Sequence, residues 1–469
     1  MKHYDVIIVG AGPAGIFSAL ELVSPALRGR HKRGLKIVLL EKGKDIEDRT
    51  CPMHVEKVSC RACPDCSLLC GWGGAGAFSD GKLNLSKDIG GNLSRYIDDA
   101  VLQSLITYTD EIYLQYGAPP NVYGSDTDKI NELKNLAGEN GLLLIPSKIR
   151  HIGTDRCPEL LKKIKADLNS KIDIAFSKDV GTILVENNRV VGVRAKDGDV
   201  IYGDFVVLAP GREGSLWLER QARAMGLSLL KNPVDIGVRV EIPASVLEPI
   251  TKIIYEPKLV FYSKKFNDKV RTFCVNPYGE VVREYIKGVW TVNGHSYSDR
   301  TTDNTNLALL VSTFFTEPFD EPHLYGRYIA RLANLLGEGV IVQRLGDLQA
   351  GRRSTPARIA RGKVKPTLTD AVPGDLSFVL PYRYISNILE MLRVMDKIAP
   401  GVNSRHTLLY GVEVKFYSRQ LKLDSNLETE VKNLFAVGDG AGVSRGLIQA
   451  SASGIIAARE ILKRVRTEN

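Results

Sequence analysis

The chain has 469 residues, which is too long for one compact core and predicts two domains. Hydrophobic residues make up 44% and charged residues 25%, as in ordinary globular proteins, and no apolar run reaches the roughly 18 residues that a membrane span needs. The formal net charge is +9, partly in two basic groups at residues 28–36 and 358–365, which predict solvated surface or attraction of an anionic substrate. No nucleic-acid-binding module accompanies them. Asp5 interrupts the apolar start, which argues against a signal peptide and predicts a cytoplasmic protein.

A nucleotide-binding pattern opens the chain. Residues 4–9 form an apolar run typical of a buried parallel strand, and a glycine-rich turn and a helical stretch follow at once. Gly10 allows the tight turn, Gly12 lets the backbone approach a pyrophosphate, and Gly15 lets the helix pack closely on the strand. The phosphates would bind the free amides at the positive end of the helix. We therefore expect dinucleotide contacts from the whole turn: Gly10, Gly12, Pro13, Ala14 and Gly15.

A second apolar strand, residues 35–40, ends in Glu41. A carboxylate at this position can accept hydrogen bonds from both ribose hydroxyls, and its charge disfavours a 2′-phosphate. Glu41 follows Gly15 at a larger separation than usual, and the loop of residues 24–34, which looks inserted, accounts for the difference. Strand, glycine turn, helix, second strand and acid in this order predict a dinucleotide site that includes Glu41 and its neighbour Lys42.

Two later segments indicate which dinucleotide is bound. Residues 205–208 are an apolar strand followed by Gly211, and residues 434–437 are another, followed by Gly438 and Asp439. The second segment resembles the strand and Gly-Asp motif near the C-terminus of the two-dinucleotide-binding-domain flavoproteins. The resemblance implies FAD, with Asp439 hydrogen-bonded to its ribityl chain.

Two further segments complete the expected FAD site. A helix rich in small residues is predicted over residues 447–462, and its start at Gly446 and Leu447 would place amides and partial positive charge near the flavin N1 and C2 carbonyl. Residues 180–193 predict two strands joined by an Asn-Asn-Arg turn. In the flavoproteins that the chain resembles, the residue entering such a hairpin pairs with adenine through its backbone, which implies this role for Val180.

Five of the seven cysteines lie between Cys51 and Cys70. Four of them have the spacing of a bacterial ferredoxin run, although Gly71 stands where a proline normally follows: Cys60, Cys63, Cys66 and Cys70. Such thiolates can surround an iron–sulfur cluster or, with less support from the spacing, a zinc ion, and Cys51 is an alternative ligand. Redox-active cysteines and unpaired structural thiols are the other interpretations. The leading hypothesis is an iron–sulfur cluster.

The cysteines continue directly into a glycine-rich string, residues 71–83. The string resembles the Gly-Gly-Ala-Gly-x-Phe-Ser-Asp-Gly-Lys-Leu signature of a family of uncharacterised FAD-dependent dehydrogenases, and residues 292–296 and 351–354 extend the resemblance over most of the chain. The family implies FAD and redox chemistry without an agreed substrate, and its larger members lack the cysteines. Gly73 and Gly74 remove side chains where the backbone would pass close to the flavin or its pyrophosphate.

Residues 233–423 alternate strand-like and helical stretches. We expect strands at residues 236–242, 258–261, 272–275 and 288–292, and helices at residues 306–313, 324–335 and 385–398. The predicted fold class is α/β, a discontinuous, three-layer Rossmann-type FAD-binding domain with an inserted α+β substrate domain. We assign residues 1–50, 136–232 and 424–469 to the FAD-binding domain, 51–135 to a cysteine- and glycine-rich excursion, and 233–423 to the substrate domain.

The insert carries no second glycine fingerprint after a strand, which argues against a separate nicotinamide-binding domain and leaves NAD(P)H as a reductant that docks transiently. His295, Asp347, Arg352 and Arg353 are candidates to face a substrate, with His295 as an acid or base and the arginine pair binding an anionic group. We expect an FAD-dependent dehydrogenase or reductase that moves a hydride to or from a small organic substrate. The alternatives are a flavin enzyme without net redox change, such as a folate-dependent methyltransferase or an isomerase, and a flavin or iron–sulfur electron-transfer partner of another redox protein.

Overall fold

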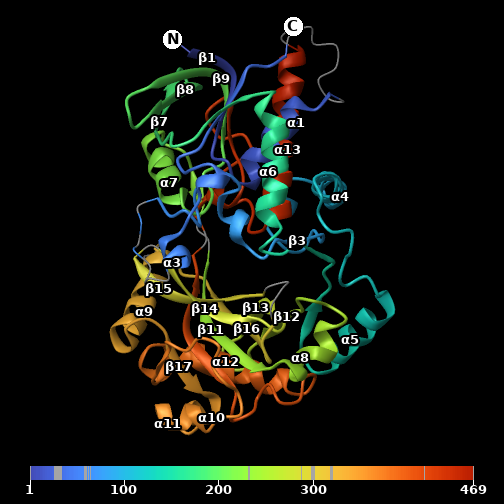
Figure 1. Ribbon diagram of the computed structural model, residues 1–469, viewed down its shortest axis with the longest axis vertical. Helices are drawn as coiled ribbons and strands as arrows, with labels where there is room; N and C mark the ends of the chain where they lie inside the picture. Colours follow the sequence, from blue (N-terminus) through green and yellow to red (C-terminus); the bar gives the residue numbers. More distant parts are fainter. Residues whose placement is uncertain are drawn as a thin grey trace. The chain divides into compact units, whose positions relative to one another are not determined.

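The computed structural model describes residues 2–25, 34–56, 61, 63, 65–230, 233–286, 288–296, 301–316, 319, 321–416 and 418–467. The chain divides into two compact units (Figure 1). The first comprises residues 1–121, 150–231 and 418–469, and the second comprises residues 122–149 and 232–417. Residues 51–121 of the expected excursion thus belong to the first unit and residues 122–135 to the second. The first unit is discontinuous in sequence, as the predicted fold class requires.

A mostly parallel sheet forms the centre of the first unit. The strand order is β6-β2-β1-β9-β8-β7, and β21 also pairs with β9. The apolar runs predicted as strands around residues 4–9, 35–40, 205–208 and 434–437 are confirmed as buried strands of this sheet. The bounds are β1 (Lys2–Val9), β2 (Ile37–Leu40), β6 (Asp173–Ala175), β7 (Val180–Glu186), β8 (Arg189–Ala195), β9 (Val200–Leu208) and β21 (Leu434–Ala436). This is the Rossmann-type arrangement expected for the first unit.

Two helices from opposite ends of the chain lie side by side in the first unit, α1 (Pro13–Val23) in blue and α13 (Leu447–Thr467) in red (Figure 1). Their backbones meet at Gly454, whose carbonyl oxygen accepts a hydrogen bond of 3.1 Å from the Ser18 hydroxyl. The remaining helices and strands of this unit are α3 (Pro52–Val55), β3 (Lys82–Asn84), α4 (Asp99–Gln115), α6 (Cys157–Asn169), α7 (Ser215–Ala224), β10 (Leu229–Leu230) and β20 (Gln420–Leu421). β5 (Ile149–His151) spans the division between the units.

A sheet with the strand order β18-β17-β19-β11-β16-β13-β12-β4 forms the centre of the second unit. Its strands are β4 (Leu143–Ile145), β11 (Val234–Pro243), β12 (Lys258–Tyr262), β13 (Lys269–Asn276), β16 (Asn304–Thr313), β17 (Ile341–Arg344), β18 (Val372–Pro373) and β19 (Leu408–Lys415). A separate hairpin consists of β14 (Glu280–Ile286) and β15 (Val289–His295). The helices are α5 (Thr127–Glu139), α8 (Ala244–Thr251), α9 (Pro322–Gly337), α10 (Leu345–Gln349), α11 (Pro356–Ala360) and α12 (Tyr382–Met395). The unit therefore has the mixed α+β character that the sequence predicts.

One predicted element of the second unit is wrong. Residues 306–313 were expected to be helical but belong to strand β16, which pairs with β11 on one side and β13 on the other. Residues 304–311 are all buried, so the sequence shows none of the alternation that marks a half-exposed strand. The other predicted strands of the insert, and the helices α9 and α12, are confirmed. In the part of the chain that the structure describes, no helix is both long enough and apolar enough to cross a membrane.

The close packing of α1 on α13 depends on the absence of a side chain at Gly454. A Cβ there would lie 2.1 Å from the Ala14 carbonyl oxygen and 2.8 Å from the Ser18 hydroxyl. We predict that Gly454→Ala lowers the free energy of unfolding by about 1–3 kcal/mol, because the two helices must separate. The measurement is the shift of the first urea-induced unfolding transition.

Gly138→Ala is the matched control for this prediction. Gly138 also lies in a helix, α5, but a Cβ there would meet nothing within 4 Å. The control should be neutral or stabilising by up to about 1 kcal/mol, because alanine favours the helix. Equal effects of the two substitutions would show that helix propensity, rather than the contact between α1 and α13, decides the result.

Candidate functional site

The glycine turn connects β1 to α1 without room for side chains on its inner side. A Cβ at Gly10, where φ is +105°, would lie 2.2 Å from the Ala209 carbonyl oxygen, and a Cβ at Gly15 would lie 1.9 Å from the Gly10 carbonyl oxygen. At Gly12, in contrast, a Cβ would meet nothing within 4 Å. No side chain of the described residues caps α1, so the amides of its first turn that follow Pro13 are left without a side-chain acceptor. The turn thus offers the donors and the room that a phosphate group needs.

The Glu41 carboxylate holds three backbone segments together. One carboxylate oxygen accepts a hydrogen bond of 2.8 Å from the Ala11 amide in the glycine turn. The other oxygen accepts bonds of 2.8 Å from the Gly43 amide and 2.9 Å from the Gly71 amide. The side chain is buried, and the residue is only 6% exposed. Glu41 therefore holds the turn after β2 and the start of the glycine-rich string against the glycine turn.

Arg49 fixes the same string from its other side. Its guanidinium donates hydrogen bonds to the carbonyl oxygens of Ser67 at 2.9 Å, Trp72 at 2.5 Å and Gly74 at 2.9 Å. Burial lowers the pKa of Arg49 to about 10, against the opposing effect of the Glu41 charge, so the side chain stays protonated at neutral pH. Arg49 was not predicted, because a single arginine before the cysteines gives no local signal in the sequence.

Gly73 and Gly74 lie directly against the glycine turn. The Gly73 amide donates a hydrogen bond of 2.8 Å to the Ala11 carbonyl oxygen. A Cβ at Gly74 would lie 3.1 Å from the Gly12 Cα, and Gly74 has a φ of +57°. These glycines therefore permit the close approach of two backbone segments, and this approach places them beside the space at Gly12.

The C-terminal Gly-Asp motif reaches the same region from β21. A Cβ at Gly438 would lie 3.0 Å from the Ala14 Cβ, in the first turn of α1. The Asp439 carboxylate accepts a hydrogen bond of 2.6 Å from the Ser444 hydroxyl, and its second oxygen lies 3.5 Å from the Arg212 Nε. Neither Ser444 nor Arg212 was predicted, since each is identified only by its position in the fold. The motif thus brings a carboxylate to the end of the sheet that carries the glycine turn.

Leu447 and Gly446 are two further residues that were predicted to contact FAD. Leu447 begins α13, and its side chain would lie 2.8 Å from a Cβ at Gly76, within the glycine-rich string. Gly446 packs on Gly90, with 3.3 Å between its Cβ position and the Gly90 Cα.

Two predicted residues flank the end of the parallel sheet. Gly211 follows β9 with a φ of +61°, and a Cβ there would meet nothing within 4 Å. Val180 is buried at the start of β7, two residues after Lys178, whose amide donates a 2.8 Å hydrogen bond to the Glu41 carbonyl oxygen. Segments that are far apart in the sequence therefore meet around the glycine turn.

The cysteine segment is only partly described. Cys60 lies outside the described residues, and Cys63 is exposed whereas Cys70 is buried. Burial raises the pKa of the Cys70 thiol to about 12, although the nearby Lys42 charge opposes the shift. The Lys42 Nζ lies 3.7 Å from the Asp65 carboxylate. Across the described part of the chain, no three His, Cys, Asp or Glu side chains group as a metal ion would require, and the iron–sulfur site stays a prediction.

The polar candidates of the second unit fall into separate places. Asp347 is 1% exposed and accepts hydrogen bonds from the Arg352 Nε at 3.1 Å and the Ser354 hydroxyl at 2.9 Å. Arg353 is exposed. His295 ends strand β15, opposite Glu280 of the β14–β15 hairpin. The structure therefore groups Arg352 with Asp347 as an ion pair, and it gives His295 a different position.

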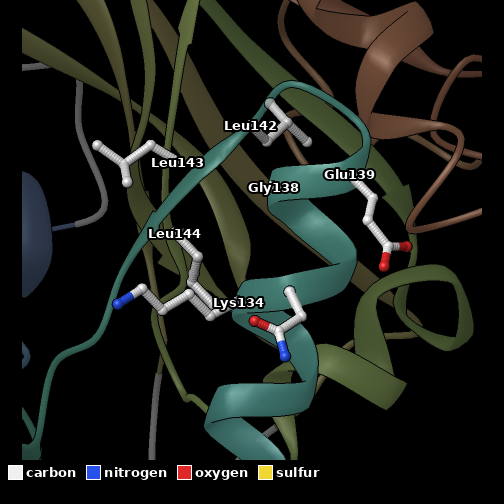
Figure 2. A pocket seen from close by; sticks show the side chains of 7 residues that line it. Lys134, Gly138, Glu139, Leu142, Leu143 and Leu144 are labelled. Atoms are coloured by element: carbon white, nitrogen blue, oxygen red, sulfur yellow. The ribbon is translucent and has the colours of Figure 1, made fainter.

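A surface hollow of the second unit lies between α5 and β4 (Figure 2). Its lining is shown as sticks: Lys134, Asn135, Gly138, Glu139, Leu142, Leu143 and Leu144. None of these residues belongs to the predicted site; Leu142 and Leu144 belong to the core that α5 and β4 share, whereas Leu143 is exposed. The hollow is therefore not part of the candidate site.

Comparison with known proteins bears first on the second unit. Residues 233–416 match the family described as FAD-dependent protein, C-terminal domain-like. An uncharacterised protein of Clostridium beijerinckii is 28% identical over 98% of this chain and 80% of its own length. The family match confirms the predicted resemblance to uncharacterised FAD-dependent flavoproteins.

Several solved structures are also similar, at low scores. Quinol fumarate reductase FrdA of E. coli has a TM-score of 0.41 at 15% identity, covering 100% of this chain and 72% of that one. L-proline dehydrogenase of P. horikoshii has a TM-score of 0.40 at 11% identity, covering 99% of this chain and 94% of that one. GidA of Aquifex aeolicus has a TM-score of 0.38 at 14% identity, covering 99% and 64%.

The contacts of Glu41 lead to a prediction for protein without bound cofactor. Glu41→Gln keeps the shape of the side chain but replaces one oxygen by an NH₂ group, so at least one of the backbone amides of Ala11, Gly43 and Gly71 loses its acceptor. We predict that the free energy of unfolding falls by about 1–3 kcal/mol in FAD-free protein, the cost of a buried unpaired donor. Urea denaturation measures this change.

Glu56→Gln is the control for charge removal, because Glu56 is exposed and forms an ion pair with the exposed Arg61. Its effect should stay within about 0.5 kcal/mol. An unchanged stability of the Glu41→Gln variant would mean that the carboxylate does not hold the three segments.

Proposed function

We propose that the first unit binds one FAD and that the chain is an FAD-dependent oxidoreductase that moves a hydride to or from a small organic substrate. The observation that carries the proposal is the meeting of the glycine turn, the Glu41 carboxylate, the glycine-rich string and the Asp439 carboxylate at one end of one parallel sheet. In open parallel sheets, ligands bind outside the carboxyl ends of the strands. A nicotinamide dinucleotide alone would have no use for a second acidic element so distant in the sequence.

The described residues fit an FAD molecule. The open space at Gly12, beside the uncapped start of α1, suits the pyrophosphate. Asp439 has a carboxylate oxygen whose nearest cation, the Arg212 Nε at 3.5 Å, leaves room for a ribityl hydroxyl to donate. In this proposal Gly10, Gly12, Pro13, Ala14 and Gly15 surround the pyrophosphate, and Val180 contacts the adenine.

Glu41 fits a narrower role than the sequence suggests. A carboxylate has about four lone-pair positions, and three backbone amides already use three of them. One position is left for a ribose hydroxyl, rather than the two that the sequence analysis assigned. We therefore propose that Glu41 acts on FAD mainly by holding the glycine turn in shape and contributes a single ribose contact.

Bound FAD would supply the hydride acceptor or donor at the flavin ring. The chain contributes positive potential through the start of α13, where Gly446 precedes and Leu447 begins a helix of 21 residues. Arg212 adds a formal positive charge close to Asp439. Positive potential of this kind favours the anionic reduced flavin, which is consistent with a dehydrogenase or reductase.

We predict that Asp439→Ala weakens FAD binding by about 10- to 150-fold, because a charge-assisted hydrogen bond worth about 1.5–3 kcal/mol is lost. The dissociation constant is measured by flavin fluorescence after reconstitution of the apoprotein. Asp197→Ala is the control, because Asp197 lies in the exposed turn between β8 and β9, where it forms an ion pair with Lys178. Equal affinity of the Asp439→Ala variant and the wild type would contradict the ribityl assignment.

Anaerobic spectroscopy of the FAD-loaded protein tests the proposed reaction class. NADH or NADPH should bleach the flavin absorbance, and a small organic oxidant should restore it with one substrate reduced per flavin. Return of the colour only with a protein or dye acceptor would favour an electron-transfer partner. Product formation without net consumption of reductant would favour a flavin enzyme of the non-redox kind.

A further inference from the structure

A group of basic side chains in the second unit stands without acidic partners. The group comes from the end of β17, from the segment before β19, and from α11 with the residues around it. Within the described part of the chain, none of its members forms an ion pair: Arg344, Arg353, Arg358, Arg361, Lys363, Lys365 and Arg405. The neighbouring Arg352 differs, because it pairs with Asp347. We call these seven residues, together with His406, the basic cluster.

Backbone contacts hold the parts of the basic cluster together. The Arg344 Nη1 donates a hydrogen bond of 3.0 Å to the Arg358 carbonyl oxygen, and the Arg358 Nη1 donates one of 2.8 Å to the Arg353 carbonyl oxygen. The Gly346 amide donates a bond of 3.2 Å to the Arg405 carbonyl oxygen, so the segments that carry Arg344 and Arg405 run side by side. The cations are thus gathered by the fold, while only neutral carbonyl groups compensate them.

Two buried nitrogen atoms of the basic cluster have no hydrogen-bond partner. One is the Nε of Arg344, a residue that is only 7% exposed, and the other is the Nδ1 of His406. A buried donor without an acceptor costs about 1–3 kcal/mol, more for a charged group, so such atoms are uncommon in folded proteins. Burial lowers the pKa of His406, and the positive charges of Arg344, Arg405 and Lys363 lower it further. An acceptor with negative charge would relieve both conditions.

The same unit compensates its other buried arginine fully. Arg239 is 0% exposed, and its guanidinium forms two hydrogen bonds of 2.9 Å with the Glu413 carboxylate. It donates further bonds to the Cys274 carbonyl oxygen at 2.8 Å and the Asn293 side chain at 2.9 Å. Arg344, in contrast, forms no ion pair within the described residues, and the nearby Asp347 carboxylate pairs with Arg352 instead. The basic cluster thus brings seven positively charged side chains together, and none of them forms an ion pair in the part of the chain that the structure describes.

We propose that the basic cluster binds a small oxyanion of the phosphate class, either free phosphate or the phosphate group of a metabolite. Phosphate carries two negative charges near neutral pH and several acceptor oxygens, which suits cations that arrive from three segments. The buried Arg344 and the half-buried His406 form the floor of the site, and Lys363 and Arg405 are two of its exposed members. The site lies wholly in the second unit, so it does not depend on the proposed FAD site.

Binding of inorganic phosphate to the full-length, FAD-loaded protein tests this inference by isothermal titration at constant ionic strength, with chloride as the reference anion. We expect saturable phosphate binding that Arg344→Gln weakens at least tenfold. Because Arg344 is buried, Arg405→Gln and Lys363→Gln provide exposed variants that should fold normally, each with a loss of about threefold or more. Arg331→Gln, a charge removal in α9 of the same unit, should change the dissociation constant by less than twofold.

The ring proton signal of His406 gives an independent readout by NMR. The pKa of His406 should rise when phosphate is present and should stay unchanged with chloride, since a bound anion favours the protonated ring. Competition identifies the source of the ligand: displacement of phosphate by NADPH but not by NADH indicates a 2′-phosphate, and displacement by neither indicates free phosphate. Absence of saturable binding, or equal affinity in the Arg344→Gln, Arg405→Gln and Lys363→Gln variants, would overturn the inference. The FAD content of the same samples reports on the first unit separately.

Discussion

The first unit depends on one buried carboxylate. Glu41 connects the turn before α1, the turn after β2 and the start of the glycine-rich string by accepting a hydrogen bond from a backbone amide of each. Two of these segments, the turn before α1 and the string, are rich in glycine and have few side chains with which to hold one another in place. A charged acceptor compensates for this lack, because bonds to an ionised group are about twice as strong as neutral ones. The shape of the candidate dinucleotide site is therefore set from behind, by a residue that a ligand would meet only at its edge.

This dependence explains which parts of the site could be predicted from the sequence. The glycine turn, Glu41 and the Gly-Asp motif were identified because each function requires a particular residue type at a particular local spacing. Arg49 and Arg212 were missed because their partners, backbone carbonyls and the Asp439 carboxylate, are distant in the sequence. Ser444 was missed because a serine that follows a Gly-Asp motif gives no signal of its own. Strand β16 was predicted as a helix because a run that is buried on both faces lacks the alternation that identifies strands. The alternation of apolar and polar residues identifies a strand that is exposed on one face, and it is missing from a strand that is buried on both faces.

The cysteine segment has its base fixed independently of its thiols. Glu41 binds the Gly71 amide, and Arg49 binds the carbonyl oxygens of Ser67, Trp72 and Gly74, so these hydrogen bonds of both charged side chains go to the backbone. Trp72 is fully buried below this base, and its indole donates to the Leu161 carbonyl oxygen. The structure thus accounts for the expectation that relatives without the cysteines keep the same fold. Cysteine chemistry is an addition to this base, and the fold does not require it.

The placement of β21 and α13 affects how the protein is made. Both elements come from residues 418–469, yet β21 pairs with β9 and α13 packs on α1, which are synthesised much earlier. On the ribosome, the apolar faces of α1 and β9 stay uncovered until residues 232–417 have emerged and the final segment follows. Long-range contacts of this kind slow folding and leave surfaces open to aggregation. The second unit, in contrast, has all of its segments available earlier, so it can complete its core while the first unit still waits for its last strand.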